Sequence, residues 1–126
     1  MNKIRTVSTI LLAIPLIVFG SNYFLHLFPL PPGDGSSGAQ LIQAMRDGGL
    51  MAAIALSHVV AGILLVVPRT RFLGGLLQLP MSLGIVAFHI TMLPAGLAVA
   101  IPLLLLNLGV IADLARLCSL VEKNPS

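Results

Sequence analysis

Amide, hydroxyl and imidazole side chains recur at helical spacing inside the apolar stretches of this sequence. Ser82 follows Gln78 by four residues and His89 follows Ser82 by seven, so all three share one face of a helix. Asn22 and His26 repeat the four-residue spacing near the start of the chain. An imidazole can bind a metal, relay a proton near neutral pH or form a hydrogen bond with a ligand. These positions are therefore the first candidates for a functional site.

The elements that hold these side chains are too apolar for a small water-soluble domain. Hydrophobic residues make up 57% of the chain and charged residues 9%, and the mean hydropathy is +1.04; ordinary soluble domains have about 25% charged residues. Phe72 to Ala112 contains no Lys, Arg, Asp or Glu, and is about twice as long as the roughly 20 residues of one bilayer crossing. Continuous apolar runs exclude a β-barrel, whose strands alternate polar and apolar residues. The sequence therefore predicts an all-α membrane protein.

Four apolar runs predict four transmembrane helices, which we expect to form one domain over residues 1–126, a compact antiparallel bundle. The first run is longer than a signal-peptide core, so we interpret it as a span. A turn over Met92–Gly96 divides the charge-free stretch in two. Ala39–Asp47 predicts a short helix at the outer surface, capped by Ser36 or Ser37. The predicted spans are residues 7–28, 50–67, 72–93 and 95–116.

Basic residues are distributed unequally between the two sides that four crossings create. Arg46 is the only Lys or Arg on the side of the loop rich in Pro and Gly. Because cytoplasmic segments carry the excess of basic residues, both termini are predicted to lie in the cytoplasm and this loop outside. The basic residues form no patch for nucleic acid, and anionic lipid headgroups are their expected neighbours. The six on the other side are Lys3, Arg5, Arg69, Arg71, Arg116 and Lys123.

The depth of each polar residue in the membrane limits which of them can meet. At a rise of 1.5 Å per residue, His26 and His89 lie within about one turn of the outer surface, whereas His58 lies about 12 Å below it. His58 is four residues before Gly62, so a polar group and a close-packing position share a face. We expect two layers of polar side chains. The outer layer is His26 with His89, and the deeper layer is Asn22, His58, Ser82 and, as a further member, Asn107.

Four interpretations of these polar residues are open. Three histidines suggest a metal site, but their different depths argue against a common centre about 2 Å from each ligand, and we predict no metal. A quinone or lipid headgroup between the helices would accept a hydrogen bond from His or Asn, which makes quinone the one cofactor considered. His58 alone would relay protons. In the fourth interpretation, hydrogen bonds between helices, each about 1 kcal/mol or less, specify the packing.

Short strings in three of the apolar runs form an ordered set. Phe19–Pro31 reads FGSNYFLHLFPLP, and Val60–Leu65, Leu79–Pro80 and Ile85–His89 follow it along the chain. In this order they resemble strings of DoxX-like membrane proteins, over nearly the whole chain. The resemblance implies a compact four-helix bundle in the bacterial cytoplasmic membrane. It also implies either a link to thiosulfate:quinone oxidoreduction or an accessory role in membrane assembly or redox stress.

Three positions depart from the usual pattern of that family. Tyr23 stands where family members often carry Lys, His58 where they often carry Glu, and Gly84 where they often carry Asn. A family function that depends on an intramembrane Glu is therefore not implied here. His58 would replace that Glu as a polar partner, with different protonation behaviour.

The sequence as a whole favours a non-catalytic function. It contains no P-loop, dinucleotide fingerprint, HExxH or nucleophile motif. Cys118 is the only cysteine, which excludes intramolecular disulfide chemistry. We predict an accessory or assembly subunit whose partners are the lipid bilayer and a membrane protein or a second copy of the chain. The alternative is a quinone-linked redox subunit in which the quinone headgroup is held by His26, Asn22, His58 and His89. A transporter is disfavoured because four short helices leave little room for alternating access.

Overall fold

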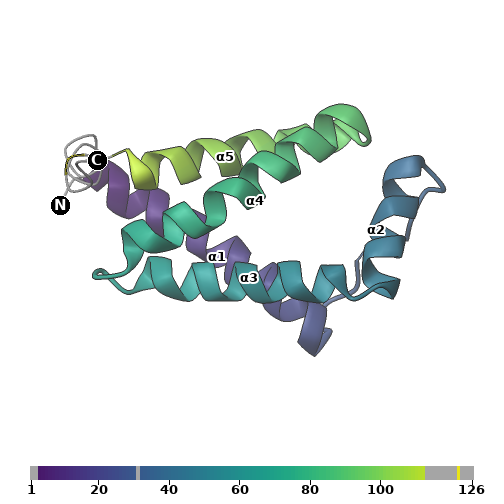
Figure 1. The fold of residues 1–126 in the computed structure, drawn as a ribbon, viewed down its shortest axis with the longest axis horizontal. Helices are drawn as coiled ribbons and strands as arrows, with labels where there is room; N and C mark the ends of the chain where they lie inside the picture. The colour runs from purple at the N-terminus through teal and green to yellow at the C-terminus, as the bar shows by residue number, and fades with distance from the viewer. Residues whose placement is uncertain (1–2, 31, 113–121, 123–126) are drawn as a thin grey trace.

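The chain folds almost entirely into helices, as the ribbon in Figure 1 shows. The computed structural model describes residues 3–30, 32–112 and 122, and this part of the chain contains no strand. The prediction of an all-α fold is confirmed, and a short helix is present in the first loop. The elements are α1 (Lys3–Leu25), α2 (Ser37–Asp47), α3 (Leu50–Val66), α4 (Arg71–Thr91), the 3₁₀ helix η1 (Pro94–Gly96) and α5 (Leu97–Ile111).

In the described part of the chain, the long helices α1, α3, α4 and α5 lie side by side along the long axis, and α2 stands across one end of them (Figure 1). α1 packs against α3 and α5, and α4 packs against the same two helices. α2 stands at 85° to α3. We call the end of the molecule that carries α2 the α2 end, and the opposite end, where α1 begins, the N-terminal end.

Three segments are long and apolar enough to cross a membrane: α1, α4 and Pro94–Ile111. α3 has 17 residues and meets the same condition only together with α2, as a bent pair. The described residues therefore provide three candidate spans, or four if the bent pair counts as one. The bounds of α3 and α4 differ from the predicted 50–67 and 72–93 by no more than two residues.

α1 is displaced toward the N-terminus relative to the predicted span 7–28, because it starts four residues earlier and ends three residues earlier. Its end is determined by Asn22, whose Oδ1 accepts a hydrogen bond from the N–H of Phe28 at 2.9 Å and holds the chain in a turn. His26 lies in this turn with a φ of 51°, in the left-handed region. Phe28 also precedes Pro29, which disfavours helical backbone at that position.

α2 has a defined start and end. Ser36 is its N-cap: the Ser36 Oγ accepts a hydrogen bond from the N–H of Ala39 at 3.2 Å, which decides between the two predicted caps, Ser36 and Ser37. The helix therefore starts two residues before the predicted Ala39. Gly48 ends it, and Gly49, with a φ of 80°, turns the chain into α3. Such a backbone angle favours glycine.

The predicted span 95–116 begins with the 3₁₀ turn η1 and continues as α5. Pro94 stands at the first position of η1, where its missing N–H costs no hydrogen bond. Residues 113–116 of the predicted span, and Cys118 after it, lie outside the described residues.

The long helices combine an apolar outer surface with polar side chains in the interior. Val99 and Leu105 of α5 are 70% and 61% exposed, whereas Gln78, Ser82 and Asn107 are 0% exposed. Small residues bring the helices close enough to enclose these polar groups. The apolar core cluster next to them consists of Leu12, Ala13, Leu16, Ala61, Leu65 and Val110.

Candidate functional site

A row of hydrogen-bonded polar side chains crosses the interior from α3 through α4 to α5. His58 Nδ1 lies 3.1 Å from Gln78 Oε1, and Gln78 Nε2 donates to Ser82 Oγ at 3.4 Å. Ser82 Oγ donates to Asn107 Oδ1 at 2.7 Å, and Asn107 Nδ2 donates to the carbonyl oxygen of Gly75 at 2.9 Å. We call these five residues the polar row. It joins three helices through groups that are mostly inaccessible to solvent.

The carbonyl of Gly75 determines the direction of every hydrogen bond in the polar row. Because a carbonyl oxygen only accepts, the Asn107 amide presents its NH₂ to Gly75 and its oxygen to Ser82. The Ser82 hydroxyl therefore donates to Asn107 and accepts from the NH₂ of Gln78, whose oxygen faces His58. That oxygen also only accepts, so His58 Nδ1 carries the proton. In the neutral ring, Nε2 of His58 is then a hydrogen-bond acceptor.

His58 also lines an open groove at the α2 end. The groove has a volume of about 1190 Å³ and lies between α1, residues 27–30 with 32 and 33, α2 and the start of α3. Asn22, His26, Gln43 and Arg46 contribute polar groups to its wall. Among the described residues that line the groove there is no Asp or Glu, and Arg46 is the one with a permanent positive charge. Its aromatic residues are Phe19, Tyr23, Phe24 and Phe28.

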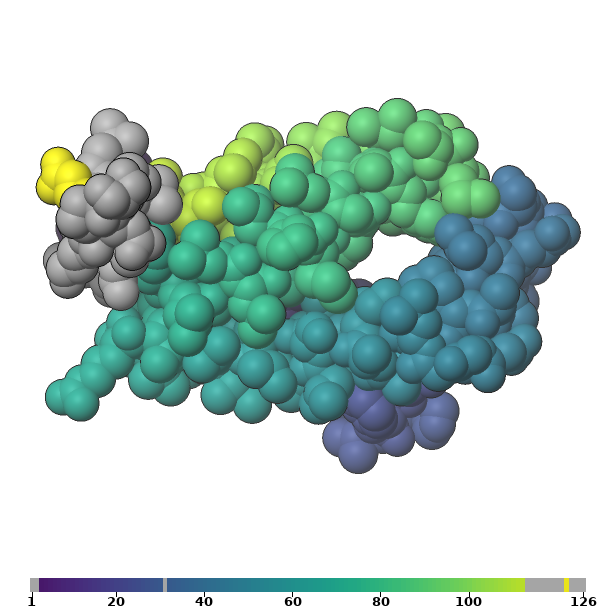
Figure 2. Space-filling model, viewed as in Figure 1, coloured from purple at the N-terminus to yellow at the C-terminus, as the bar shows by residue number. Residues whose placement is uncertain are grey.

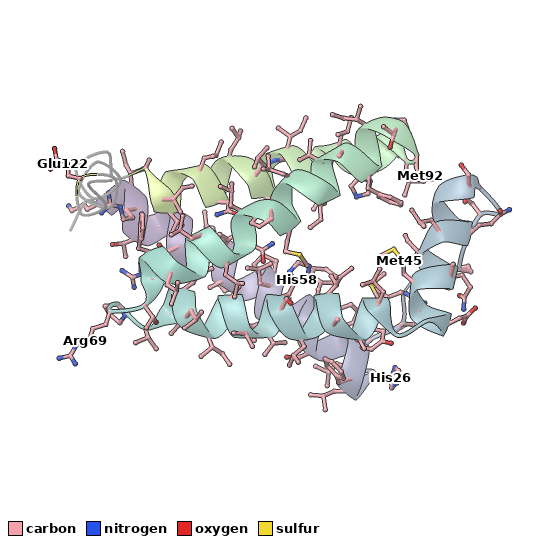
Figure 3. All side chains as sticks on the ribbon, in the orientation of Figure 1. His26, Met45, His58, Arg69, Met92 and Glu122 are labelled. Carbon is pink, nitrogen blue, oxygen red and sulfur yellow. The ribbon has the colours of Figure 1, made fainter. Side chains whose placement is uncertain are left out.

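The five predicted site residues do not form one cluster. His58 and Ser82 are both members of the polar row. Asn22 and His26 line the groove with His58, but the Asn22 Oδ1 is occupied by the N–H of Phe28, and the Asn22 side chain ends α1 rather than joining the row. Figure 3 shows His26 beyond the end of α1, at the periphery of the molecule, whereas His58 points from α3 into the interior.

His89 belongs to the turn between α4 and η1. Its Nδ1 lies 3.0 Å from the carbonyl oxygen of Leu93. Its imidazole occupies the space beside Gly96, where an added Cβ would overlap the ring. No hydrogen bond joins His89 to His26 in the described part of the chain. The predicted outer layer of these two histidines is therefore replaced by two separate turns, because α1 ends early and its chain turns away at His26.

Gln78 links His58 to Ser82, although neither of the two predicted layers of polar side chains included it. The four-residue spacing from Gln78 to Ser82 indicated that they share a face of α4. That this face meets His58 depends on how α3 and α4 are rotated against each other, which spacing along one helix does not show. The role of the Gly75 carbonyl had no signal in the sequence, because every residue has a carbonyl.

Figure 2 shows an opening through the viewed face at the α2 end, bounded by α2, α3 and the end of α4. Met45 points from α2 toward this opening, and Met92 lies at the end of α4 (Figure 3). Beyond the opening α2 and α4 meet, because a Cβ added to Gly38 would lie 3.1 Å from the carbonyl oxygen of Met92. The outer halves of α3 and α4 are therefore separated, while their inner halves pack closely.

In the described ranges, 3–30, 32–112 and 122, no three His, Cys, Asp or Glu side chains are arranged to hold a metal ion. Comparisons of the chain with protein-family models, with curated proteins and with solved structures found no match. We therefore infer the function from the residues and geometry of the chain itself.

Proposed function

We propose that this chain is an integral protein of the bacterial cytoplasmic membrane, which it crosses four times as a compact antiparallel bundle. The observation that supports the proposal best is that apolar side chains cover the outside of the helices while polar side chains lie in the interior, the reverse of a water-soluble protein. Val99 and Leu105 face outward, while Gln78, Ser82 and Asn107 are buried and hydrogen-bonded to one another or to backbone. Water would favour the reverse arrangement, whereas hydrocarbon favours this one because a polar group facing lipid has no partner.

The bent pair of α2 and α3 is compatible with one span and one surface helix. The 17 residues of α3 extend about 25 Å, a few ångströms less than the roughly 30 Å hydrocarbon core. Bilayers thin locally around a short span at modest cost. Because α2 stands at 85° to α3, it would then lie along the outer membrane surface.

The basic residues support an orientation with both termini in the cytoplasm. Lys3 and Arg5 begin α1, and Arg69 lies at the same end of the molecule (Figure 3). Arg46 alone belongs to α2 at the opposite end. The positive-inside rule then assigns the N-terminal end to the cytoplasm and the α2 end to the outside.

We propose that the protein acts as a non-catalytic accessory or assembly subunit, as the resemblance to DoxX-like proteins also suggests. The polar row supports this role, since its groups bind one another and thereby specify helix packing. The exposed apolar faces offer contact area to another membrane protein or to a second copy of the chain. Nothing in the charge distribution favours nucleic acid.

Thiol labelling tests the topology directly. Cys118 is the only cysteine, so a membrane-impermeant maleimide should label the wild type in inverted membrane vesicles and not in spheroplasts. A Cys118→Ser, Ser36→Cys variant should show the opposite pattern, because Ser36 is the N-cap of α2 and would lie at the outer end of the molecule. Labelling of both positions from one side would contradict four crossings.

Co-purification tests the accessory role. The tagged protein, solubilised in mild detergent, should elute with the same membrane protein, or as an oligomer, in repeated preparations. Deletion of the chain should lower the amount or activity of that partner. A chain that elutes as a monomer and turns over a substrate without help would refute the accessory role while leaving the membrane topology intact.

The second candidate is a quinone-linked redox subunit, favoured by the groove that joins His58, Asn22 and four aromatic residues. A quinone ring would lie in the outer half of the bundle, with its tail toward the lipid. Decylubiquinone should then bind to the purified protein, and His58→Ala should weaken binding while the helical content measured by circular dichroism stays unchanged. Equal binding to both forms would exclude His58 as the contact.

A further inference from the structure

We infer that the groove beside His58 binds an amphiphile whose ring hydroxyl donates a hydrogen bond to His58 Nε2, in preference to a ring that presents a carbonyl. This inference rests on the ligand-binding groove of the second candidate function. A quinone carbonyl would need His58 to donate a hydrogen bond. In the inferred contact, His58 accepts the hydrogen bond and the ligand donates it.

The polar row makes Nε2 of His58 a hydrogen-bond acceptor, and His58 is one of the residues that line the groove. Nδ1 of His58 donates to Gln78 Oε1, and the chain of bonds that ends at the Gly75 carbonyl prevents the Gln78 amide from turning over. Nε2 is the remaining polar atom of the ring, and it has no hydrogen-bond partner among the described residues. A carbonyl oxygen placed against it would bring two acceptors together. A hydroxyl would supply the missing donor.

The rest of the groove fits a ring with an apolar tail. Phe19, Tyr23 and Phe28 provide aromatic surfaces, against which another ring packs edge-on or offset. None of the described residues that line the groove is Asp or Glu, so none of them offers a carboxylate that competes with His58 for the hydroxyl. His58 lies about 12 Å from the start of α3 by helix rise, which places the contact below the headgroup level, where such an amphiphile partitions.

Two compounds that differ in one donor test the inference on the wild-type protein. 4-Nonylphenol has a ring hydroxyl, and 4-nonylanisole has a methoxy group in its place. Each is titrated, as a mole fraction of detergent, into the purified full chain, and thermal unfolding is followed by circular dichroism. A ligand that binds the folded state raises Tm by mass action. The phenol should bind about fivefold more tightly than the anisole, as expected for one net hydrogen bond.

Variants separate the contact at His58 from general partitioning into the detergent micelle. His58→Leu should abolish the difference between the two compounds, and His89→Leu, which changes a histidine outside the groove, should preserve it. Gln78→Leu removes the acceptor that holds the proton on Nδ1, so His58 becomes free to present a proton from Nε2. This variant should therefore gain affinity for decylubiquinone, whose ring presents carbonyls.

The outcomes distinguish this inference from the proposals on which it rests. Equal binding of phenol and anisole by the wild type would overturn the inference, whether or not the variants fold. Tighter binding of decylubiquinone than of 4-nonylphenol would also overturn it, and would leave the quinone-linked candidate standing. If none of the three compounds binds, both the inference and the ligand-binding groove fail, while the labelling result for membrane topology is unaffected.

Discussion

Replacing Gly74 by Ala is expected to push α4 away from α3, whereas the same replacement at Gly84 is expected to be harmless. A Cβ added at Gly74 would lie 2.9 Å from the backbone N of Leu65 and 3.0 Å from the carbonyl oxygen of Ala61. Both atoms belong to the backbone of α3, so neither can move without the helix. A Cβ added at Gly84 on the same helix has no neighbour within 4 Å.

The magnitude follows from the size of the required shift. An ordinary contact is at least 3.4 Å, so α4 must move by about 0.5 Å at Gly74, where the separation would be 2.9 Å. Overpacking of this kind costs about 1–3 kcal/mol. The gain in helix propensity from Gly to Ala, up to about 1 kcal/mol, applies to both variants and cancels between them. We therefore expect Gly74→Ala to be about 2 kcal/mol less stable than Gly84→Ala.

Unfolding in mixed micelles measures this difference. Each variant is titrated with sodium dodecyl sulfate, and the loss of helix is followed by circular dichroism, so that the midpoints report relative free energies of unfolding. Equal midpoints for the two variants would refute the close approach of α3 and α4 at Gly74. A lower midpoint for Gly84→Ala would mean that the face of α4 that carries Gly84 is packed against a partner.

Three further predictions address the polar groups. Asn107→Leu removes two interior hydrogen bonds at about 0.6 kcal/mol each, so the same titration should show that the free energy of unfolding falls by about 1 kcal/mol. An unchanged free energy of unfolding would mean that Ser82 is not held through Asn107. Two hydrogen bonds, first from the side chain and then from the backbone of Ser36, lower the pKa of Asp34 below its ordinary 3.8. The turn formed by Asp34 and Ser36 is therefore stabilised above pH 3.8. It loses this stabilisation as the pH falls through the lower pKa that Asp34 has in the folded state. In an NMR titration Ser36→Ala should raise the pKa of Asp34, and an unchanged value would contradict this cause. His26→Ala should change the free energy of unfolding by less than about 0.5 kcal/mol, because its side chain is exposed; a larger loss would indicate a partner.

Much of the fold could be predicted because composition and period are local properties. Three such signals are the charge-free run from Phe72, the helix break at Pro94 and the Ser36 cap, each of which depends on residues near one another in the chain. The helices α4, η1 and α2 begin close to these three positions. The end of α1 was harder to predict. A single side chain, Asn22, captures the N–H of Phe28, and an apolar sequence continues past the break without any change in period.

The sequence predicted several of the polar residues that belong to the candidate site, but not which of them form hydrogen bonds with one another. The sequence identified His58, Ser82 and Asn107 as polar residues at similar depth, because depth follows from position along a helix. It did not identify Gln78 as the link between them, nor the separation of His26 from His89. Those relations depend on the rotation of each helix about its axis and on the path of the turns.

The sequence by itself determined that this protein is helical, apolar on most of its length and poor in charges, because these properties belong to residues one by one or to their nearest neighbours. Only the tertiary structure decided which polar groups meet. In particular, the backbone carbonyl of Gly75 orients four side chains on three helices and so determines which nitrogen of His58 carries the proton. A hydrogen-bond direction is a property of the whole connected row, so no single residue or spacing contains it.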